Sequence, residues 1–245
     1  MSTPEIHIKA EEILNIGAFP ITNTLLSSFL IAGILLVMAL FVRKNLSLVP
    51  GRIQNFLEII IENILKIMDS VLTDMRISEK YLPLVATIFL FVLISNWLGL
   101  IPGVGSFGLN GEHLKPIFRP PSSDLNFTIA LAAIAVLSVN VFAVLAIGFK
   151  KHFSKFFTLK NPIFSFIGLL EFFSEFVKVI SFSFRLFGNI FAGKVLLLIV
   201  AFLIPYFVPL PFLFLELFIG FIQAFIFAML TLVFIAMAIQ TTEAH

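Results

Sequence analysis

The chain has 245 residues, of which 60% are hydrophobic and only 12% are charged, about half the charged share of an ordinary soluble protein. A fold of this length in water needs far more polar surface, so the mean hydropathy of +1.10 indicates a protein embedded in a lipid bilayer. The net charge of +2 includes no long basic run, which argues against nucleic acid as a partner. The chain has no cysteine and its four histidines show no metal-ligand spacing, so we expect neither a metal site nor another cofactor.

The first apolar segment, residues 21–42, has no charged side chain and is long enough for a helix to cross a hydrocarbon core of about 30 Å. Residues 1–20 before it are polar and acidic, unlike a cleavable signal peptide, and we interpret them as a tail on the outer side of the membrane. Three basic residues and a Pro-Gly break follow the segment directly.

Residues 52–76 predict a different kind of helix, one that does not cross the membrane. Its apolar side chains recur at helical spacing, whereas Glu58, Glu62, Lys66 and Asp69 lie three or four residues apart on another face. A helix with this many charges is too polar to span, so we expect it to lie along the membrane surface or to pack on a partner.

Two further uncharged segments, residues 81–101 and 125–149, predict the second and third crossings. Residues 102–124 between them are rich in Gly and Pro and predict a polar outer loop, whereas residues 150–162 form a basic loop. Lys and Arg concentrate in this basic loop and after the first segment. The positive-inside rule therefore places both on the cytoplasmic side and the N-terminus outside.

The last third predicts two unusually long helices, residues 163–204 and 211–240, joined by a proline-rich reversal. Forty helical residues measure about 60 Å, twice the apolar thickness of a bilayer. The first long helix must therefore tilt steeply, break at Gly188 or Gly193, or extend beyond the lipid. The segments together predict an all-α polytopic membrane protein. It is a single domain with five crossings, a surface helix and a long, tilted helical hairpin that returns the C-terminus to the cytoplasmic side.

Ionisable side chains inside apolar helices are the strongest functional signal in this sequence. Each charge at mid-bilayer costs on the order of 3 kcal/mol, so such residues usually serve an ion path, a proton relay or a counter-ion. Arg185 is the clearest case, because a guanidinium does not deprotonate and the nearest acids in the sequence lie at least ten positions away.

Helical geometry separates the other candidates from one another. Glu171, Lys178 and Arg185 are spaced by seven residues and share one face with Ser181 and Asn189. On an ideal helix, the residue nine positions after Arg185 points about 180° away from it and lies roughly 13 Å further along. That residue is Lys194, which should therefore lie on a different surface of the helix and at a different depth in the membrane from Arg185.

Lys194 and Glu216 fall at similar depths when both are counted from the proline-rich reversal, so they could pair across the hairpin near the outer side. Simpler interpretations stay open. Lys194 would extend to the outer headgroups, with Glu216 as its structural partner, and Gln223 would only form a hydrogen bond between helices. Glu171, Glu175 and Lys178 would then be interfacial charges near the start of their helix.

Three motifs carry a resemblance to a known family. The run from Ser183 to Gly193 (SFRLFGNIFAG) closely resembles the signature of subunit a of F-type ATP synthase. The run from Gln223 to Phe227 (QAFIF) resembles the motif of that family's last helix, and Pro121 to Asn126 (PSSDLN) resembles the segment that opens its fourth helix. The similarity covers nearly the whole chain and keeps the order and spacing of the helices.

The resemblance implies a stator subunit that passes protons through two aqueous half-channels to the carboxylates of a c-subunit ring. It also implies the b-subunit peripheral stalk and the rest of the ATP synthase as partners, together with the lipid bilayer. A bacterial inner membrane is the expected location, with an organellar inner membrane as the alternative. Arg185 corresponds to the family's essential arginine, Gln223 to its glutamine and Asn189 to its conserved asparagine.

One departure from the family pattern concerns Lys194. At this position the family often has Glu or His, paired with His or Glu at the position of Glu216. An unperturbed lysine titrates near 10.4 and is a poor proton relay at neutral pH, so we favour Glu216 over Lys194 as a proton-path residue. Ser181 is a further candidate for the proton path, and four residues are candidates for the two channel mouths: Asp124, Glu171, Glu175 and Lys178.

Two other functions are compatible with the composition alone. A secondary transporter would bind an anion at Arg185, although the chain shows no internal repeat of the kind that inverted-repeat transporters have. A non-conducting membrane scaffold would use the arginine only to bind lipid headgroups. No Gly-rich phosphate loop is present, so we expect no catalytic site for ATP in this chain. Co-purification with a ring of small hairpin proteins would separate the stator from both alternatives.

Overall fold

Five helices long and apolar enough to cross a membrane dominate the part of the chain that the computed structural model describes. The described residues are 12–16, 19–44, 51–101, 108–109, 115–116, 118–149, 162–205 and 207–240. The five helices are α1 (Asn23–Lys44), α3 (Met75–Leu98), α4 (Leu125–Ile147), α6 (Pro162–Leu203) and α7 (Pro209–Gln240). They confirm the predicted all-α polytopic membrane fold.

The amphipathic helix α2 spans Arg52–Leu72 and packs mainly on α3. Met68 and Leu72 are buried there, whereas apolar side chains near its start, such as Phe56, are exposed. This is the arrangement expected of a helix that lies at the membrane surface. The helix ends at Leu72 instead of residue 76, because Thr73 adopts a left-handed conformation with φ 58° and closes the last turn.

Asp74 then starts the next helix, earlier than the apolar pattern at 81–101 suggested. Its Oδ1 accepts a hydrogen bond of 2.9 Å from the backbone N–H of Arg76, which is a helix N-cap. Helix α3 therefore includes a charged first turn as well as the apolar segment. A boundary set by capping is weakly visible to an analysis based on hydropathy.

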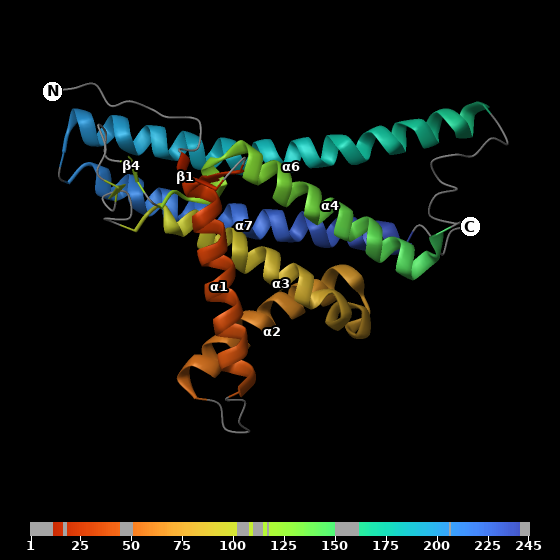
Figure 1. The fold of residues 1–245 in the computed structure, drawn as a ribbon. Helices are drawn as coiled ribbons and strands as arrows, with labels where there is room; N and C mark the ends of the chain where they lie inside the picture. Colours follow the sequence, from red (N-terminus) through yellow and green to blue (C-terminus); the bar gives the residue numbers. More distant parts are fainter. Residues whose placement is uncertain are drawn as a thin grey trace.

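Helix α6 is continuous over its 42 residues, so a break at Gly188 or Gly193, one of the three alternatives left open by the sequence, does not occur. A helix of this length measures about 63 Å and fits a bilayer only when it is strongly inclined. In Figure 1, α6 and α7 run across the view beside each other, whereas α1 runs crosswise to both. The described structure thus contains the tilted hairpin that the sequence predicts.

Short irregular elements occur where the sequence predicts a tail and an outer loop. Strands β1 (Glu12–Ile16) and β2 (Phe19–Thr22) pair antiparallel, as do β3 (Gly108–Leu109) and β4 (Lys115–Pro116). A 3₁₀ turn, η2 (Pro121–Ser123), leads directly into α4. The predicted basic loop after α4, from residue 150 to residue 161, lies outside the described residues.

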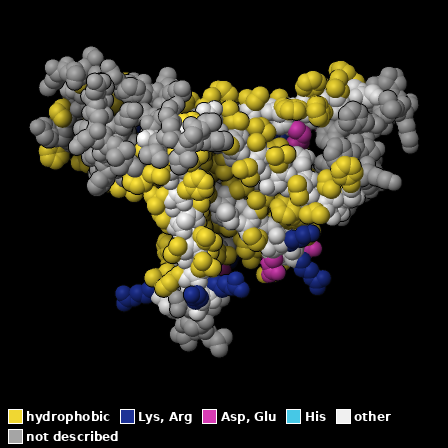
Figure 2. Space-filling view, viewed as in Figure 1, with side chains coloured by type: hydrophobic (Ala, Val, Ile, Leu, Met, Phe, Trp, Pro, Cys, Tyr) yellow, Lys and Arg dark blue, Asp and Glu magenta, His cyan; other side chains and the backbone are white. Residues whose placement is uncertain are grey.

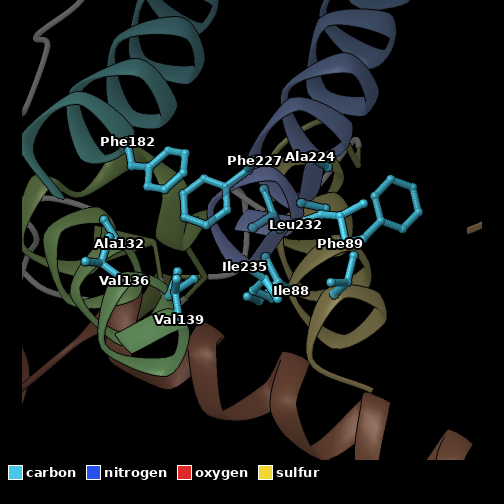
Figure 3. Packing of buried hydrophobic residues seen from close by; sticks show 14 of the residues in the cluster. Ile88, Phe89, Ala132, Val136, Val139, Phe182, Ala224, Phe227, Leu232 and Ile235 are labelled. Atoms are coloured by element: carbon cyan, nitrogen blue, oxygen red, sulfur yellow. The ribbon is translucent and has the colours of Figure 1, made fainter. Parts of the chain in front are cut away.

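The buried core forms where α3, α4, α6 and α7 meet (Figure 3). The rings of Phe182 on α6 and Phe227 on α7 stack with their centroids 4.8 Å apart. The face of α4 directed at this core is lined by small residues at helical spacing: Thr128, Ala132, Ala135, Val139 and Ala143. Small residues allow two membrane helices to approach closely, and here they bring α4 against α6.

The visible outer surface is largely apolar. In Figure 2, hydrophobic side chains cover the helices, and Lys and Arg gather at the lower edge, around the end of α1 and along α2 and α3. Helix α1 accordingly has large exposed side chains such as Phe29, Leu36 and Val37. Contact of such an apolar surface with lipid is favourable, whereas its contact with water is unfavourable.

The small-residue face of α4 generates a first prediction. Ala132→Leu adds three carbons at a fully buried position, so it should separate α4 from α6 and destabilise the chain by about 1–3 kcal/mol. Ala146→Leu makes the same change at an exposed position of α4 and should have little effect. Thermal unfolding of the detergent-solubilised protein measures both variants. Equal melting temperatures would contradict the proposed packing.

Candidate functional site

Arg185 lies on the face of α6 that is directed away from the protein core. Its neighbours Phe182 and Leu186 are buried at 3% and 0% exposure, whereas Arg185 itself is exposed. Among the residues that the structure describes, Arg185 has neither a hydrogen bond nor an ion pair. A permanent charge on an apolar membrane surface needs a partner, and no described residue of this chain provides one.

Arg185 shares this exposed face with other residues that the sequence singles out. Ser181 and Asn189, one helical turn before and after it, are also exposed, as helical spacing predicts. The side chains between them are apolar, including Phe184 at 56% exposure. The outer face of α6 is therefore an apolar surface with one positive charge and two small polar groups.

Asn189 connects this face to the interior of the hairpin. Its Nδ2 donates a hydrogen bond of 2.7 Å to Oε1 of Gln223, which is only 2% exposed. Gln223 belongs to a buried stripe on α7 that also contains Glu216, Gly220 and Phe227. The structure therefore brings together Asn189 and Gln223, two residues that lie 34 positions apart in the sequence.

Glu216, at the N-terminal end of that stripe, lies directly against the backbone of α6 at Gly193. A Cβ atom at position 193 would overlap the Glu216 carboxylate, so a larger residue there would require the end of this side chain to move. The carboxyl group is 5% exposed. Glycine thus lets an acidic side chain enter the contact between the two long helices.

Lys194 does not form the ion pair with Glu216 that the sequence suggests; no such pair occurs among the described residues. Its Nζ instead donates a hydrogen bond of 3.0 Å to Oγ of Ser123 in η2. The Arg119 Nε donates to the same oxygen at 3.1 Å, and that hydroxyl donates in turn to the Pro120 carbonyl. Two cations therefore converge on one serine, a contact that sequence analysis missed.

Asp124 has a clear structural role in addition to any functional one. It is the N-cap of α4, with Oδ1 accepting from the backbone N–H of Asn126 at 3.0 Å. Its other oxygen accepts a 2.9 Å hydrogen bond from Thr24 of α1, which lies 100 positions away in the sequence. The carboxylate is 8% exposed, so it is a buried charge held by two elements.

A cavity of about 460 Å³ opens beside Asp124, between α1, α3 and α4. Its polar side includes Thr22, Ser28 and Asn126, and its apolar side is formed by aromatic rings such as Phe91 and Phe127. These two rings stack with centroids 6.0 Å apart. The cavity provides enough space for several water molecules next to a carboxylate.

The last turn of α3 forms hydrogen bonds with the η2 turn and with α7. Ser122 Oγ in η2 donates to Ser95 Oγ at 3.0 Å. Asn96 and Trp97 donate to backbone carbonyls of α7, Asn96 to Gly220 at 2.9 Å and Trp97 to Leu217 at 3.1 Å. Sequence analysis missed these contacts, although the polar pair Ser95-Asn96 inside an uncharged segment was a usable signal.

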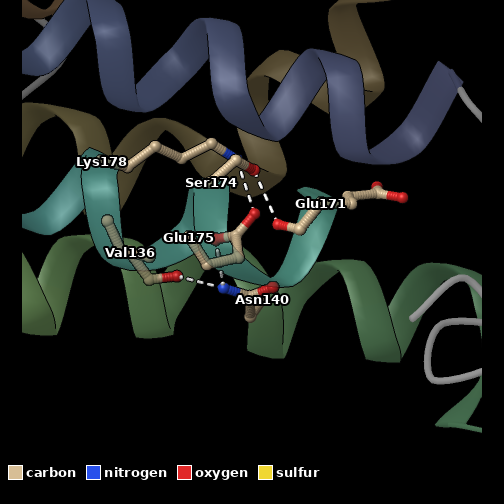
Figure 4. A network of polar contacts seen from close by, with 6 residues as sticks. All are labelled: Val136, Asn140, Glu171, Ser174, Glu175 and Lys178. Carbon is tan, nitrogen blue, oxygen red and sulfur yellow. Dashed lines mark hydrogen bonds and ion pairs between the residues drawn. The ribbon is translucent and has the colours of Figure 1, made fainter. Parts of the chain in front are cut away.

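A second polar cluster lies nearer the start of α6 (Figure 4). Glu175 forms an ion pair of 2.5 Å with Lys178 and accepts a 3.1 Å hydrogen bond from Asn140 of α4. The Lys178 ammonium also lies 4.7 Å from the centroid of the Phe234 ring on α7. Glu171 points away from this pair in Figure 4. Arg185 thus lies along α6 between two separate polar clusters.

Comparison with known proteins identifies the family. The sequence profile of the ATP synthase A chain family matches residues 25–236. The chain belongs to this family. It is 35% identical over 241 residues to ATP synthase subunit a of Campylobacter fetus subsp. fetus, covering 98% of this chain and 99% of the relative. It is also 31% identical over 230 residues to ATP synthase subunit a of Moorella thermoacetica, covering 94% and 96%.

A third relative, ATP synthase subunit a 3 of Pelobacter propionicus, is 36% identical over 220 residues, 89% of this chain and 87% of the relative. The similarity therefore includes the whole described membrane region, from α1 to α7. Together with the five apolar helices, it makes this chain an integral membrane protein of the ATP synthase A chain family.

The contact between Gly193 and Glu216 generates the second prediction. Gly193→Ala would place a methyl group where the Glu216 carboxylate lies, so the carboxylate must leave this buried position, at a cost of about 1 kcal/mol. Gly188→Ala is the matched control, since a Cβ there meets nothing within 4 Å. Thermal unfolding of the purified chain in detergent should show a lower melting temperature only for Gly193→Ala. An equal loss for both variants would contradict the close contact.

Proposed function

We propose that this chain is the stator subunit that carries protons to and from the c-subunit ring of a rotary F-type ATP synthase. The proposal depends on one observation above all: Arg185 is an exposed permanent charge on an apolar face of α6, without a partner among the described residues. Family membership supports the assignment, because the relatives are subunits of ATP synthase.

The chemistry of a rotor carboxylate explains why an arginine would be placed there. A carboxylate can turn into lipid only in its neutral form, because the charged form loses its hydration. Facing a guanidinium within a few Å, the same group is stabilised as the anion and releases its proton. Arg185 would therefore drive deprotonation on each passing c subunit, and its positive charge would block direct proton flow between the two half-channels.

The outer half-channel would begin at the cavity beside Asp124. From there, polar groups lead inward through Ser123 and Lys194 to Glu216, and then to the Gln223–Asn189 contact next to Arg185. Glu216 would be the proton carrier in this series. Lys194, held by Ser123, would serve as a nearby fixed positive charge.

The inner half-channel would use the second polar cluster, where Glu175, Lys178 and Asn140 interact. On the same helix, Glu171 lies before this cluster, and Ser181 lies after it in the direction of Arg185. A proton that crosses between the two sides releases about 2.3 kcal/mol per 100 mV of membrane potential. Several protons are needed for each ATP, which requires a rotor with many sites.

We further propose a bacterial inner membrane as the location, with the N-terminus outside and the C-terminus in the cytoplasm. The basic residues at the end of α1 support this orientation through the positive-inside rule. The b-subunit peripheral stalk and the other subunits would hold the chain against the ring. ATP chemistry would take place elsewhere in the complex, because the sequence contains no phosphate-binding loop.

The third prediction tests the role of Arg185 in the whole complex reconstituted into vesicles. Arg185→Ala should reduce ATP-driven proton pumping by about 100-fold or more, the effect expected when one member of a desolvated charge pair is removed. Arg43→Ala changes an exposed arginine at the end of α1 and should leave pumping nearly unchanged. Near-normal pumping by Arg185→Ala would refute the mechanism. Substrate uptake by the purified chain alone would instead favour a transporter.

The fourth prediction compares the two charged residues of the outer path. Glu216→Gln keeps the size of the side chain but cannot release a proton, so pumping should fall about 100-fold, as for the loss of a general acid or base. Lys194→Gln can still donate to Ser123 and should reduce pumping by less than about tenfold. Both measurements use the same vesicles. The reverse order of the two effects would show that the lysine, and not the glutamate, transfers the proton.

A further inference from the structure

Ser183 lies on the buried face of α6, almost opposite Arg185. Two residues along an α-helix correspond to a rotation of about 200°, so the two side chains project to opposite sides of α6. Ser183 is 0% exposed, whereas Arg185 is exposed. The serine belongs to the same SFRLFGNIFAG motif as the arginine, and the proposed function gives it no role. Its contacts hold the side of α6 that faces away from the arginine.

The Ser183 hydroxyl forms a hydrogen bond with α4. Its Oγ lies 3.0 Å from Oγ1 of Thr128, a side chain that is also 0% exposed. The Thr128 hydroxyl donates its one hydrogen to the Leu125 carbonyl, at 3.0 Å. Ser183 must therefore be the donor in the bond between the two hydroxyls. The result is a short chain of hydrogen bonds that leads from α6 to the first turn of α4.

The first turn of α4 is itself held firmly in the fold. Asp124 caps this helix and accepts a 2.9 Å hydrogen bond from Thr24 of α1. The backbone N–H of Thr128 donates to the Asp124 carbonyl at 3.0 Å. The η2 turn directly before Asp124 packs on α3 and α6. Ser183 is thus bonded to a group that α1 and the η2 turn hold in place.

The other contacts on the buried side of α6 are apolar and fix its rotation poorly. The ring of Phe182 stacks on that of Phe227 of α7, with the centroids 4.8 Å apart (Figure 3). The face of α4 opposite α6 carries small side chains such as Ala132 and Ala135. Small side chains allow membrane helices to approach closely, but they form no deep ridges that oppose rotation. A hydrogen bond is directional, so the bond between the two hydroxyls restricts this rotation.

Arg185 lies between two bonds of this kind. Asn189, one turn after it, donates to Gln223 of α7 at 2.7 Å, and Ser183 precedes it by two residues. One hydrogen bond would act as a pivot about which α6 could still turn, whereas bonds to two different helices define a single rotation. The tip of a side chain lies about 6 Å from the helix axis, so a rotation of about 30° moves it by about 3 Å. A displacement of about 1 Å can lower a reaction rate about 100-fold.

We propose that Ser183 and Thr128 are positioning residues for Arg185. Their hydrogen bond fixes the rotation of α6 and so the direction in which the guanidinium projects from the exposed face. The effect of this direction on proton transfer rests on the proposed function, whereas the rotation of α6 itself does not. The competing explanation is that the bond only adds stability, in which case pumping per assembled complex would not change.

The first test measures ATP-driven proton pumping per assembled complex in reconstituted vesicles. Thr128→Val keeps the shape of the side chain and removes the hydroxyl, so pumping should fall at least about tenfold as the guanidinium leaves its position. Thr128→Ser retains the hydroxyl and should pump within about twofold of the unmodified rate.

Thr231→Val is the matched control for this test. Thr231 is also 0% exposed, but its hydroxyl donates to the Phe227 carbonyl of its own helix, at 2.9 Å. The same chemical change there removes no bond between helices and should leave pumping nearly unchanged. Equal pumping by Thr128→Val and Thr231→Val, or a loss in Thr128→Ser as large as that in Thr128→Val, would overturn the proposal.

A comparison of three variants tests whether Ser183 and Thr128 act through the same bond. Ser183→Ala, Thr128→Val and the double variant should all lose the same factor, about tenfold, because the second change removes a bond that is already broken. Independent packing effects would instead multiply, to about 100-fold in the double variant. That result would show that the bond is not the cause of the loss.

A distance measurement detects the rotation of α6 without any pumping. The chain contains no cysteine, so Phe184→Cys on the exposed face of α6 and Leu145→Cys on the exposed face of α4 provide two unique thiols for spin labels. Double electron–electron resonance on the purified full chain gives the distribution of distances between the labels. Adding Thr128→Val should broaden this distribution by about 3 Å, whereas adding Thr231→Val should not. The same distribution in both variants would show that the bond does not set the rotation.

The two kinds of measurement separate the failure of this inference from the failure of the proposed function. If Arg185→Ala stops pumping but Thr128→Val does not, the chain is the stator and the bond between Ser183 and Thr128 only stabilises it. If Arg185→Ala continues to pump, the proposed function fails, and the distance distribution alone decides whether the bond sets the rotation of α6.

Discussion

A lipid bilayer cannot hydrate a charge, and most of this structure follows from that constraint. Every ionisable or polar group inside the apolar helices must find a partner in the protein, in trapped water or in another subunit. Glu175 pairs with Lys178, Lys194 with Ser123, and Asp124 with Thr24 and its own helix N-terminus. Arg185 has no such partner among the described residues and is exposed on α6. In the proposed mechanism that partner is the carboxylate of a passing c subunit.

Helices α3 and α6 contact the η2 turn, and α7 packs on both of these helices, so that several polar side chains lie close together. Glycines and hydroxyl groups allow this close packing. Gly193 leaves space for the Glu216 carboxylate, and Gly220 leaves space for the Asn96 side chain. The Ser123 hydroxyl accepts hydrogen bonds from two cationic side chains, Arg119 and Lys194. Close backbone approach and small hydrogen-bonding groups stabilise membrane helices where the hydrophobic effect contributes little. The same features leave buried polar atoms such as Oδ1 of Asn96 beside the stripe that contains Glu216 and Gln223.

Several site residues were identifiable from the sequence, because a charge in an apolar helix is a local signal. Arg185, Glu216 and Glu175 stand out without any knowledge of the fold. Their partners were not identifiable, since Thr24 lies 100 positions from Asp124 and Asn96 lies 124 positions from Gly220. Depth counting placed Lys194 near Glu216, yet the lysine bonds to Ser123. Counting residues along two helices gives an approximate depth and does not account for a third element that packs against them.

Hydropathy and charge alone determined the number of crossings, the surface helix and the long hairpin, because the bilayer imposes a length and a polarity on each segment. They also single out Arg185 as a permanent charge inside an apolar segment. Tertiary structure decided that α6 continues through both glycines, that Thr73 and Asp74 divide α2 from α3, and that Asn189 bonds to Gln223. These features depend on capping and on side-chain contacts between distant segments, which hydropathy does not encode. The sequence thus identifies the charges inside the apolar helices, and the fold determines which groups surround each charge and which face of α6 is exposed.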